Sequence, residues 1–130
     1  ANRLNKEASM RSRWIEYQDK KIFYQDFSGL LYDADALKKE LTQVQAEVVS
    51  QPKNSLLILS DFRDTNITNE MMSLLSASST LTKDHVHRTA VLGVTGIKRT
   101  LADLLTRLTG QQLRYFDTES DAKDWLVIGD

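Results

Sequence analysis

The amino-acid sequence predicts a single α/β domain with the element order β-β-α-β-α-β-α-β-α. Residues 56–60 begin Leu-Leu-Ile-Leu, and an apolar run without polar alternation is typical of a strand buried at the centre of a parallel sheet. Elsewhere apolar residues recur at helical spacing between the expected strands. Because strands that alternate with helices pair in parallel through right-handed crossovers, we expect a mostly parallel five-stranded sheet with an N-terminal antiparallel hairpin and four helices.

The first half of the chain predicts a hairpin and a long helix ahead of the central strand. Aromatic and β-branched residues fill 14–17 and 21–27, and the polar residues 18–20 predict a short connection between them. Asp33 or Asp35 can cap the helix that follows. The apolar positions of this helix, which we expect to face inward, are Leu37, Leu41, Val44 and Val48.

The second half predicts three more helices and two more strands. Thr68 is the best N-cap for the second helix, and a strand is expected at 89–94. A third helix is expected at 97–110 and a last strand at 113–116. Thr118 has the spacing of a capping box ahead of the final helix. The inward stripe of the second helix is expected to be Ile67, Met71, Leu74, Leu75 and Ser78.

The composition excludes several classes of protein. Hydrophobic residues make up 41% and charged residues 27% of the 130 residues, a balance that excludes a disordered chain. A formal net charge of −1 provides no general attraction to nucleic acid or to an anionic membrane. No apolar run approaches the roughly 18 residues of a membrane span, and the lack of cysteine fits a reducing compartment. We therefore expect a cytoplasmic protein that binds no nucleic acid and is not an integral membrane protein.

Residues 1–12 differ from the rest of the chain. They are polar, they lack an apolar period, and their basic side chains outnumber the acidic ones. One interpretation is a basic arm for an anionic partner. We favour a flexible tail or a leader foreign to the natural chain, with Met10 as the natural start. The folded domain is then expected at 13–130.

Polar residues collect where the central strand ends, which is where ligands bind in open α/β sheets. Arg63 could hold an anion or a partner carboxylate, and the alternative is an internal salt bridge with turn-forming Asp and Asn side chains. The glycines at Gly93 and Gly96 loosely match a phosphate-binding turn, although a tight strand-to-helix turn explains them more simply. We expect one binding edge, formed by Asp61, Arg63, Asp64, Thr65, Thr68, Thr95, Gly96, Lys98 and Arg99.

The sequence indicates no catalytic residue, no metal site and no cofactor. His85 and His87 are the only histidines, and a His-x-His pair at a strand start can place both rings on one face, but no third ligand is evident. The second helix is rich in hydroxyl groups near its end, which can line a cavity or permit close packing. We favour close packing for these residues, which are Ser76, Ser78, Ser79, Thr80 and Thr82.

Three stretches of the sequence resemble a known family. They are 60–64 (Ser-Asp-Phe-Arg-Asp), 91–99 (Val-Leu-Gly-Val-Thr-Gly-Ile-Lys-Arg), and 116–118 (Phe-Asp-Thr) with Ala122, Trp125 and Leu126. With the leading hairpin, they are similar to the STAS-like domains, a name that joins sulfate transporters and anti-sigma-factor antagonists. The resemblance covers residues 13–128 and is strongest to small free-standing bacterial STAS-like proteins of unassigned activity.

The resemblance implies a non-enzymatic binding or regulatory module that recognises another protein or a small anionic or apolar ligand. Antagonist members are switched by phosphorylation of a serine at the start of the second helix. This chain has no Asp-Ser-Ser-Gly there, which leaves Thr65 and Thr68 as candidate phosphoacceptors. Related folds include the CRAL-TRIO lipid carriers, so a carrier of a small apolar, lipid-like ligand is the alternative and an enzyme of unknown class is third. The sequence does not indicate an oligomeric state.

Overall fold

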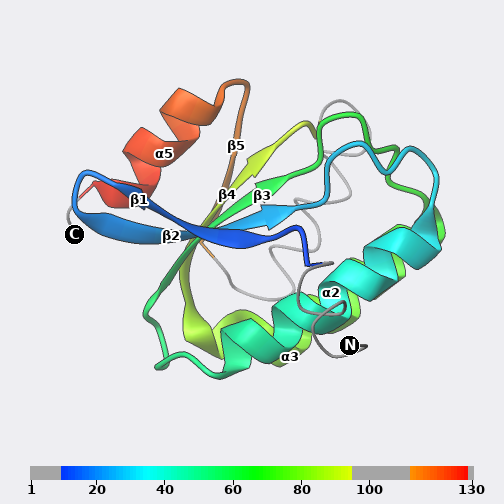
Figure 1. Cartoon of the computed structure of the whole chain (residues 1–130), viewed down its shortest axis with the longest axis horizontal. Coiled ribbons are helices and arrows are strands. Elements are labelled where there is room, and N and C mark those ends of the chain that lie inside the picture. The colour runs from blue at the N-terminus through cyan, green and yellow to red at the C-terminus, as the bar shows by residue number, and fades with distance from the viewer. Residues whose placement is uncertain (1–9, 95–111, 129–130) are drawn as a thin grey trace, which may run out of the picture.

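Five strands form one sheet in the computed structural model, which describes residues 10–94 and 112–128 (Figure 1). The strands lie in the order β1 to β5, the same order as in the sequence. β1 and β2 pair antiparallel and the other three neighbouring pairs are parallel, as the sequence predicts. The strands are β1 (Arg13–Tyr17), β2 (Lys20–Asp26), β3 (Leu56–Asp61), β4 (Val86–Leu92) and β5 (Leu113–Phe116).

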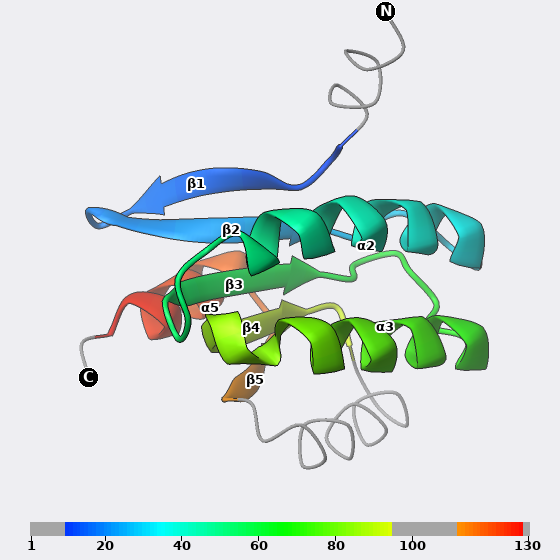
Figure 2. The ribbon, with the colours of Figure 1, turned by 90° about the horizontal axis from the view of Figure 1, so that it is seen from below.

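Helices cover both faces of this sheet. α2 and α3 lie side by side on one face, and α5 lies on the other (Figures 1 and 2). A single 3₁₀ turn, η1 (Lys83–His85), joins α3 to β4. The predicted helix at 97–110 lies outside the described residues, so three of the four predicted helices are confirmed. Their bounds are α2 (Ala34–Val49), α3 (Asn69–Thr82) and α5 (Glu119–Val127).

The turn of the N-terminal hairpin is tighter than the sequence predicts. Gln18 and Asp19 have φ angles of +50° and +66°, and two central residues with positive φ are typical of a type I′ turn. Lys20, which was expected in the connection, is the first residue of β2 and pairs with Tyr17. The twist of this turn type matches the twist of the two strands that it joins.

The three helix starts follow their predicted caps. The side chains of Asp33, Thr68 and Thr118 each accept a hydrogen bond from the backbone N–H three residues further on, at 3.0, 3.1 and 3.2 Å. Each bond satisfies one of the N–H groups that the first turn of a helix leaves free. Asp33, not Asp35, is therefore the cap of α2.

β4 is longer at its start than the sequence predicts. It begins at Val86, not at Thr89, and it ends at Leu92. The early part was missed because Arg88 is charged, yet its side chain is buried with 9% exposure. Its Nη1 donates a hydrogen bond to the backbone oxygen of Trp125 in α5, at 3.1 Å. A buried charge on the sheet is thus accommodated by a carbonyl group distant in sequence.

The two histidines do not form a pair on one strand face. His85 belongs to η1 and its Nδ1 lies 2.7 Å from the backbone oxygen of Gln51. His87 lies in β4, with its Nδ1 3.3 Å from the side-chain oxygen of Asn54. The strand-start geometry that the sequence allowed is not formed, because β4 begins at Val86, between the two residues.

The core has one part on each face of the sheet. On the α2–α3 face, all four inward positions predicted for α2 are buried. On the α5 face, strand residues such as Leu59 pack against Ala122 and Leu126. β3 supplies both parts, with Ile58 at 3% and Leu59 at 0% exposure. The prediction that this strand is the buried centre of the sheet is confirmed.

Residues 10–12 belong to the folded domain and not to a tail. Glu40 of α2 is 4% exposed and accepts a hydrogen bond from the backbone N–H of Ser12 at 2.8 Å. Met10 packs against the core on the α2–α3 face, and Arg11 forms an ion pair with Asp26 at 3.2 Å. The predicted tail therefore extends too far, and the domain begins before residue 13. Residues 1–9 lie outside the described part of the chain.

Candidate functional site

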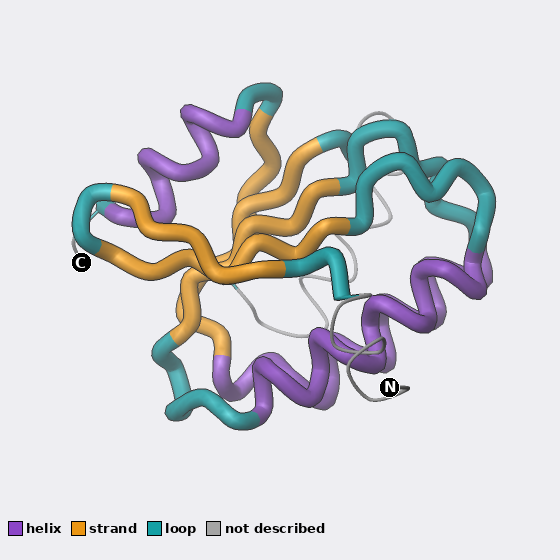
Figure 3. Tube along the Cα trace, viewed as in Figure 1, coloured by secondary structure: helices purple, strands orange, loops and turns teal. Residues whose placement is uncertain are grey.

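The loops that follow β2 and β3 run side by side at the carboxyl ends of these strands (Figure 3). We call the surface formed by residues 27–33 and 61–68 the strand-end edge. Backbone hydrogen bonds join its two halves, among them Gly29 N–H to the oxygen of Arg63 at 2.8 Å and Asn66 N–H to the oxygen of Leu31 at 2.7 Å. The sheet is thus extended into the loops, and the predicted polar residues are held on a defined backbone.

Asp61 is the most deeply buried charged residue of this edge. It is the last residue of β3, 2% exposed, and it sits on the face covered by α5. The guanidinium of Arg63 donates from Nε at 3.0 Å and from Nη2 at 2.8 Å, one bond to each carboxylate oxygen. The Tyr24 hydroxyl donates to the same carboxylate. Of the two interpretations of Arg63, the structure supports the internal salt bridge, because the bidentate face of the guanidinium already holds Asp61.

The pKa values of this cluster follow from its contacts. Burial alone would raise the pKa of Asp61, but the hydrogen bonds from Arg63 and Tyr24 outweigh burial and hold this pKa below its ordinary value. Burial and the hydrogen bond to Asp61 raise the pKa of Tyr24 to about 12. Asp61 also raises the pKa of Arg63. The cluster is therefore an ionised carboxylate held by one cation and one neutral phenol near neutral pH.

Arg63 also links the edge to α5. Its Nη2 lies 3.2 Å from a carboxylate oxygen of Glu119, in the first turn of α5. Glu119 in turn pairs with Lys123 at 2.7 Å, four residues further along the helix. The hydrogen bond from Lys123 is the main cause that lowers the pKa of Glu119. Because Arg63 is half-exposed, this part of the network is open to water.

Thr65 has a structural role at the edge. It is 7% exposed, its hydroxyl donates to the backbone oxygen of Phe27, and it accepts a hydrogen bond from Leu30 N–H at 3.0 Å. A phosphoryl group on this oxygen would break both contacts. The hydroxyl of Thr68 caps α3 and is partly exposed. Of the two candidate phosphoacceptors, Thr68 is therefore the more accessible in this conformation.

Gly93 lets the end of β4 approach the edge closely. Its φ is +84°, and a Cβ atom at this position would lie 2.5 Å from the backbone nitrogen of Arg63. This glycine therefore serves a tight backbone contact. The helix of the expected strand-to-helix turn lies outside the described residues. The predicted second half of the binding edge, which is Thr95, Gly96, Lys98 and Arg99, lies outside the described residues.

The sequence interpretation missed two exposed apolar side chains on this edge. Leu31 and Tyr32 are 60% and 72% exposed, directly after the loop that pairs with 63–66. Leu31 has a φ of +54°, an uncommon conformation for a bulky residue, and it forms a parallel bridge with Thr65. The available signal was a pair of large apolar residues between Gly29 and the helix cap, at a place where loop residues are usually polar.

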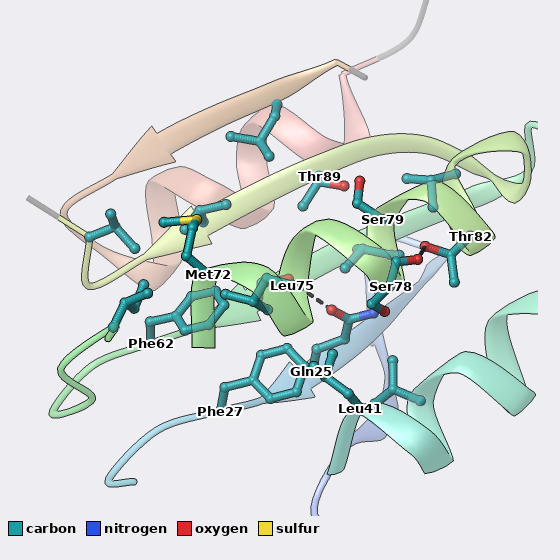
Figure 4. A pocket seen from close by; sticks show the side chains of 18 of the residues that line it. Gln25, Phe27, Leu41, Phe62, Met72, Leu75, Ser78, Ser79, Thr82 and Thr89 are labelled. Atoms are coloured by element: carbon teal, nitrogen blue, oxygen red, sulfur yellow. Dashed lines mark hydrogen bonds between the residues drawn. The ribbon is translucent and has the colours of Figure 1, made fainter. Parts of the chain in front are cut away.

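A cavity of about 120 Å³ lies between the sheet and the α2–α3 layer (Figure 4). Ser78, Ser79 and Thr82 line it, so for these three residues the cavity alternative holds in place of the close packing that the sequence favoured; Ser76 and Thr80 do not line it. Polar strand residues that face the same layer were also missed, although Gln25 stands out between Phe23 and Phe27 on the inward face of β2. Most of the wall is apolar and includes Phe27, Leu41, Val44, Ile58, Phe62 and Leu75.

In 10–94 and 112–128, no three His, Cys, Asp or Glu side chains gather in a way that could hold a metal ion. Within the same ranges, no helix has both the length and the apolar character that crossing a bilayer requires.

The mostly parallel sheet, with helices on both of its faces, defines a single domain of the α/β class. The chain belongs to the SpoIIAA-like family, whose model matches residues 14–127. This confirms the resemblance noted in the sequence. The searches of curated proteins and of solved structures gave no match.

Proposed function

We propose that this chain is a non-enzymatic binding module that holds a small, mostly apolar molecule in the cavity between the sheet and the α2–α3 layer. The observation that carries the proposal is the cavity itself, about 120 Å³ with a largely apolar wall. An engineered apolar cavity of about 150 Å³ binds benzene, whereas drug-sized pockets begin near 300 Å³. The ligand that fits is therefore about the size of a single aromatic ring, smaller than the lipid-like cargo considered from the sequence.

The absence of cysteine suits a reducing compartment, so we place this activity in the cytoplasm. We infer that an occupied cavity changes what the module recognises, a regulatory role in keeping with its SpoIIAA-like family. Occupancy can do so only if the ligand binds one conformation of the domain more tightly than another.

Thermal unfolding in the presence of benzene tests the cavity directly. A ligand present at ten times its Kd stabilises the native state by about 1.4 kcal/mol, which corresponds to a rise in Tm of a few degrees for a domain of this size. Leu75→Trp should abolish the rise because the larger side chain fills the cavity that Leu75 lines. Leu81→Trp is the matched control, because Leu81 lies on the same helix but is 63% exposed. No stabilisation of the wild type by benzene would refute the proposal.

A second candidate is recognition of a protein at the strand-end edge. The observation that favours it is the pair Leu31 and Tyr32, exposed beside the half-exposed Arg63. Tyrosine and arginine are enriched among the residues that dominate protein interfaces. The remaining members of this proposed site are Asp61, Asp64, Thr65, Thr68, Thr95, Gly96, Lys98 and Arg99.

Comparative capture from the source cell tests this edge. Tyr32→Ser should lose a partner that both the wild type and Val49→Ser retain, since Val49 is also an exposed apolar residue but lies at the end of α2. Circular dichroism should show the same fold for all three proteins. Identical captured proteins for Tyr32→Ser and the wild type would remove this edge as the working surface.

A further inference from the structure

The cavity is not uniformly apolar. Thr89 of β4 and Ser78 of α3 are 8% and 6% exposed, and both line the cavity. Gln25 of β2 also lines it, and its side-chain oxygen accepts a hydrogen bond from the Ser60 hydroxyl at 2.9 Å. Figure 4 shows the hydroxyls of Ser78, Ser79 and Thr89 toward one end and Phe62 and Met72 toward the other.

Three of these polar groups make no hydrogen bond with any residue that the structure describes. They are the Thr89 hydroxyl, the Ser78 hydroxyl and the side-chain nitrogen of Gln25. None of the three atoms is fully buried, so each can be reached by water or by an occupant of the cavity. A ligand that displaces such water loses affinity unless it replaces the hydrogen bonds of the water. The groups therefore favour an occupant that supplies hydrogen bonds at this end of the cavity.

The chemistry of the occupant follows from the groups present. A hydroxyl both donates and accepts, and the amide nitrogen of Gln25 donates. All are neutral, and none of the described residues that line the cavity carries a charge. Transfer of a carboxylate into such surroundings is strongly unfavourable, whereas a hydroxyl finds both donors and acceptors.

We propose that the polar end of the cavity selects a neutral ligand that has one hydroxyl or similar hydrogen-bonding group on an apolar body of one ring. This inference rests on the proposed ligand-binding function and defines its ligand class. A phenol or a small aromatic alcohol satisfies it. Benzene, the corresponding hydrocarbon, cannot form the hydrogen bond. Benzoate, the corresponding carboxylate, would bring an unfavourable charge into the cavity.

NMR titration of the full chain with benzene, phenol and benzoate at pH 7 tests the selection. Phenol, which is neutral at this pH, should bind about three- to tenfold more tightly than benzene, since one net hydrogen bond is worth roughly that factor. Benzoate should show no saturable binding. Thr89→Val keeps the β-branched shape and removes one of the hydroxyls, so it should reduce the preference for phenol over benzene.

Thr80→Val is the control, because Thr80 is an exposed residue of α3 whose hydroxyl bonds to the oxygen of Ser76. It should leave all three affinities unchanged. Equal affinities of the wild type for benzene and phenol would overturn the selection and leave the proposed function standing. Tighter binding of benzoate than of phenol would also overturn it. Failure of both benzene and phenol to bind would refute the cavity function itself, and this inference with it.

Discussion

Asp61 and Arg63 show how burial changes the value of one ion pair. An exposed arginine usually contributes little to stability, and Arg63 has a side chain that is 48% exposed. Its partner, however, is 2% exposed, and the Arg63 guanidinium is the cation that lies against it. Loss of the arginine would leave a buried carboxylate held by the Tyr24 hydroxyl and the backbone N–H of residue 63. The pair is therefore part of the framework of the edge.

Arg63→Ala should lower the free energy of unfolding by about 2–3 kcal/mol, which is less than for a fully buried pair because water can reach the vacated position. Urea denaturation monitored by circular dichroism measures the change. Arg13→Ala is the control, since Arg13 is more exposed and lies 3.8 Å from Asp26 in a loose pair. Equal effects of the two substitutions would show that Asp61 does not depend on its arginine.

A comparison of Gly93 with Gly29 separates two effects of an added side chain on stability, backbone strain and steric overlap. Both have positive φ, but a Cβ atom on Gly93 would lie 2.5 Å from a backbone nitrogen, whereas one on Gly29 meets nothing within 4 Å. Gly29→Ala should therefore cost about 1 kcal/mol through its φ angle alone. Gly93→Ala should cost about 2–5 kcal/mol, because the overlap adds to the same conformational cost. Denaturation midpoints check both values, and a smaller loss for Gly93→Ala would contradict the close approach.

Among the helices and strands, the sequence predicted those features that depend on neighbouring residues alone. The predicted caps Asp33, Thr68 and Thr118 are confirmed. A cap forms between one side chain and the first turn of its own helix, so it can be recognised from a short stretch of sequence. The start of β4 was missed because Arg88 is stabilised by two carbonyl groups that are distant in sequence, those of Trp125 in α5 and of Ile128 directly after it. The length of the hairpin turn was missed because Lys20 is polar on an exposed strand.

The candidate site was predicted less well than the fold, for a physical reason. The sequence placed Asp61 and Arg63 together, but which of them is buried depends on α5 packing over β3. The cavity depends on how side chains from six elements (β2, α2, β3, α3, β4 and β5) fill one space, and no local sequence pattern encodes their combined volume. The exposed pair Leu31 and Tyr32 could have been noticed as apolar residues in a loop.

Thr68 offers a test at the scale of one element. Thr68→Ala removes the hydrogen bond to Met71 N–H at 3.1 Å and should cost about 1 kcal/mol, with the loss concentrated in the first turn of α3. Hydrogen exchange of the α3 amides locates the effect. Thr80→Ala, on the exposed face of the same helix, should change exchange in the first turn little. Uniformly faster exchange throughout the sheet after Thr68→Ala would mean that this residue supports more than its helix.

For the whole molecule, the cluster of Tyr24, Asp61 and Arg63 sets how stability depends on pH at both extremes. The lowered pKa of Asp61 stabilises the native state above the ordinary pKa of an aspartate, and this contribution is lost as the pH falls through the native value. The raised pKa of Tyr24 acts in the opposite sense, because its contribution is complete below pH 10 and is lost as the pH rises toward 12. Stability should therefore fall at both ends of the range for reasons located in one cluster.

Tyr24→Phe separates the loss of stability at high pH from the loss at low pH. Between pH 10 and pH 12, the unfolded wild type releases the phenolic proton while the native state retains it, so the wild type should lose about 2 kcal/mol that the variant does not lose. Denaturant titrations at several pH values measure the slopes. Tyr32→Phe is the control, because Tyr32 is 72% exposed and its alkaline slope should match that of the wild type. Parallel slopes for Tyr24→Phe and the wild type above pH 10 would show that burial and the bond to Asp61 do not raise the pKa of Tyr24 in solution.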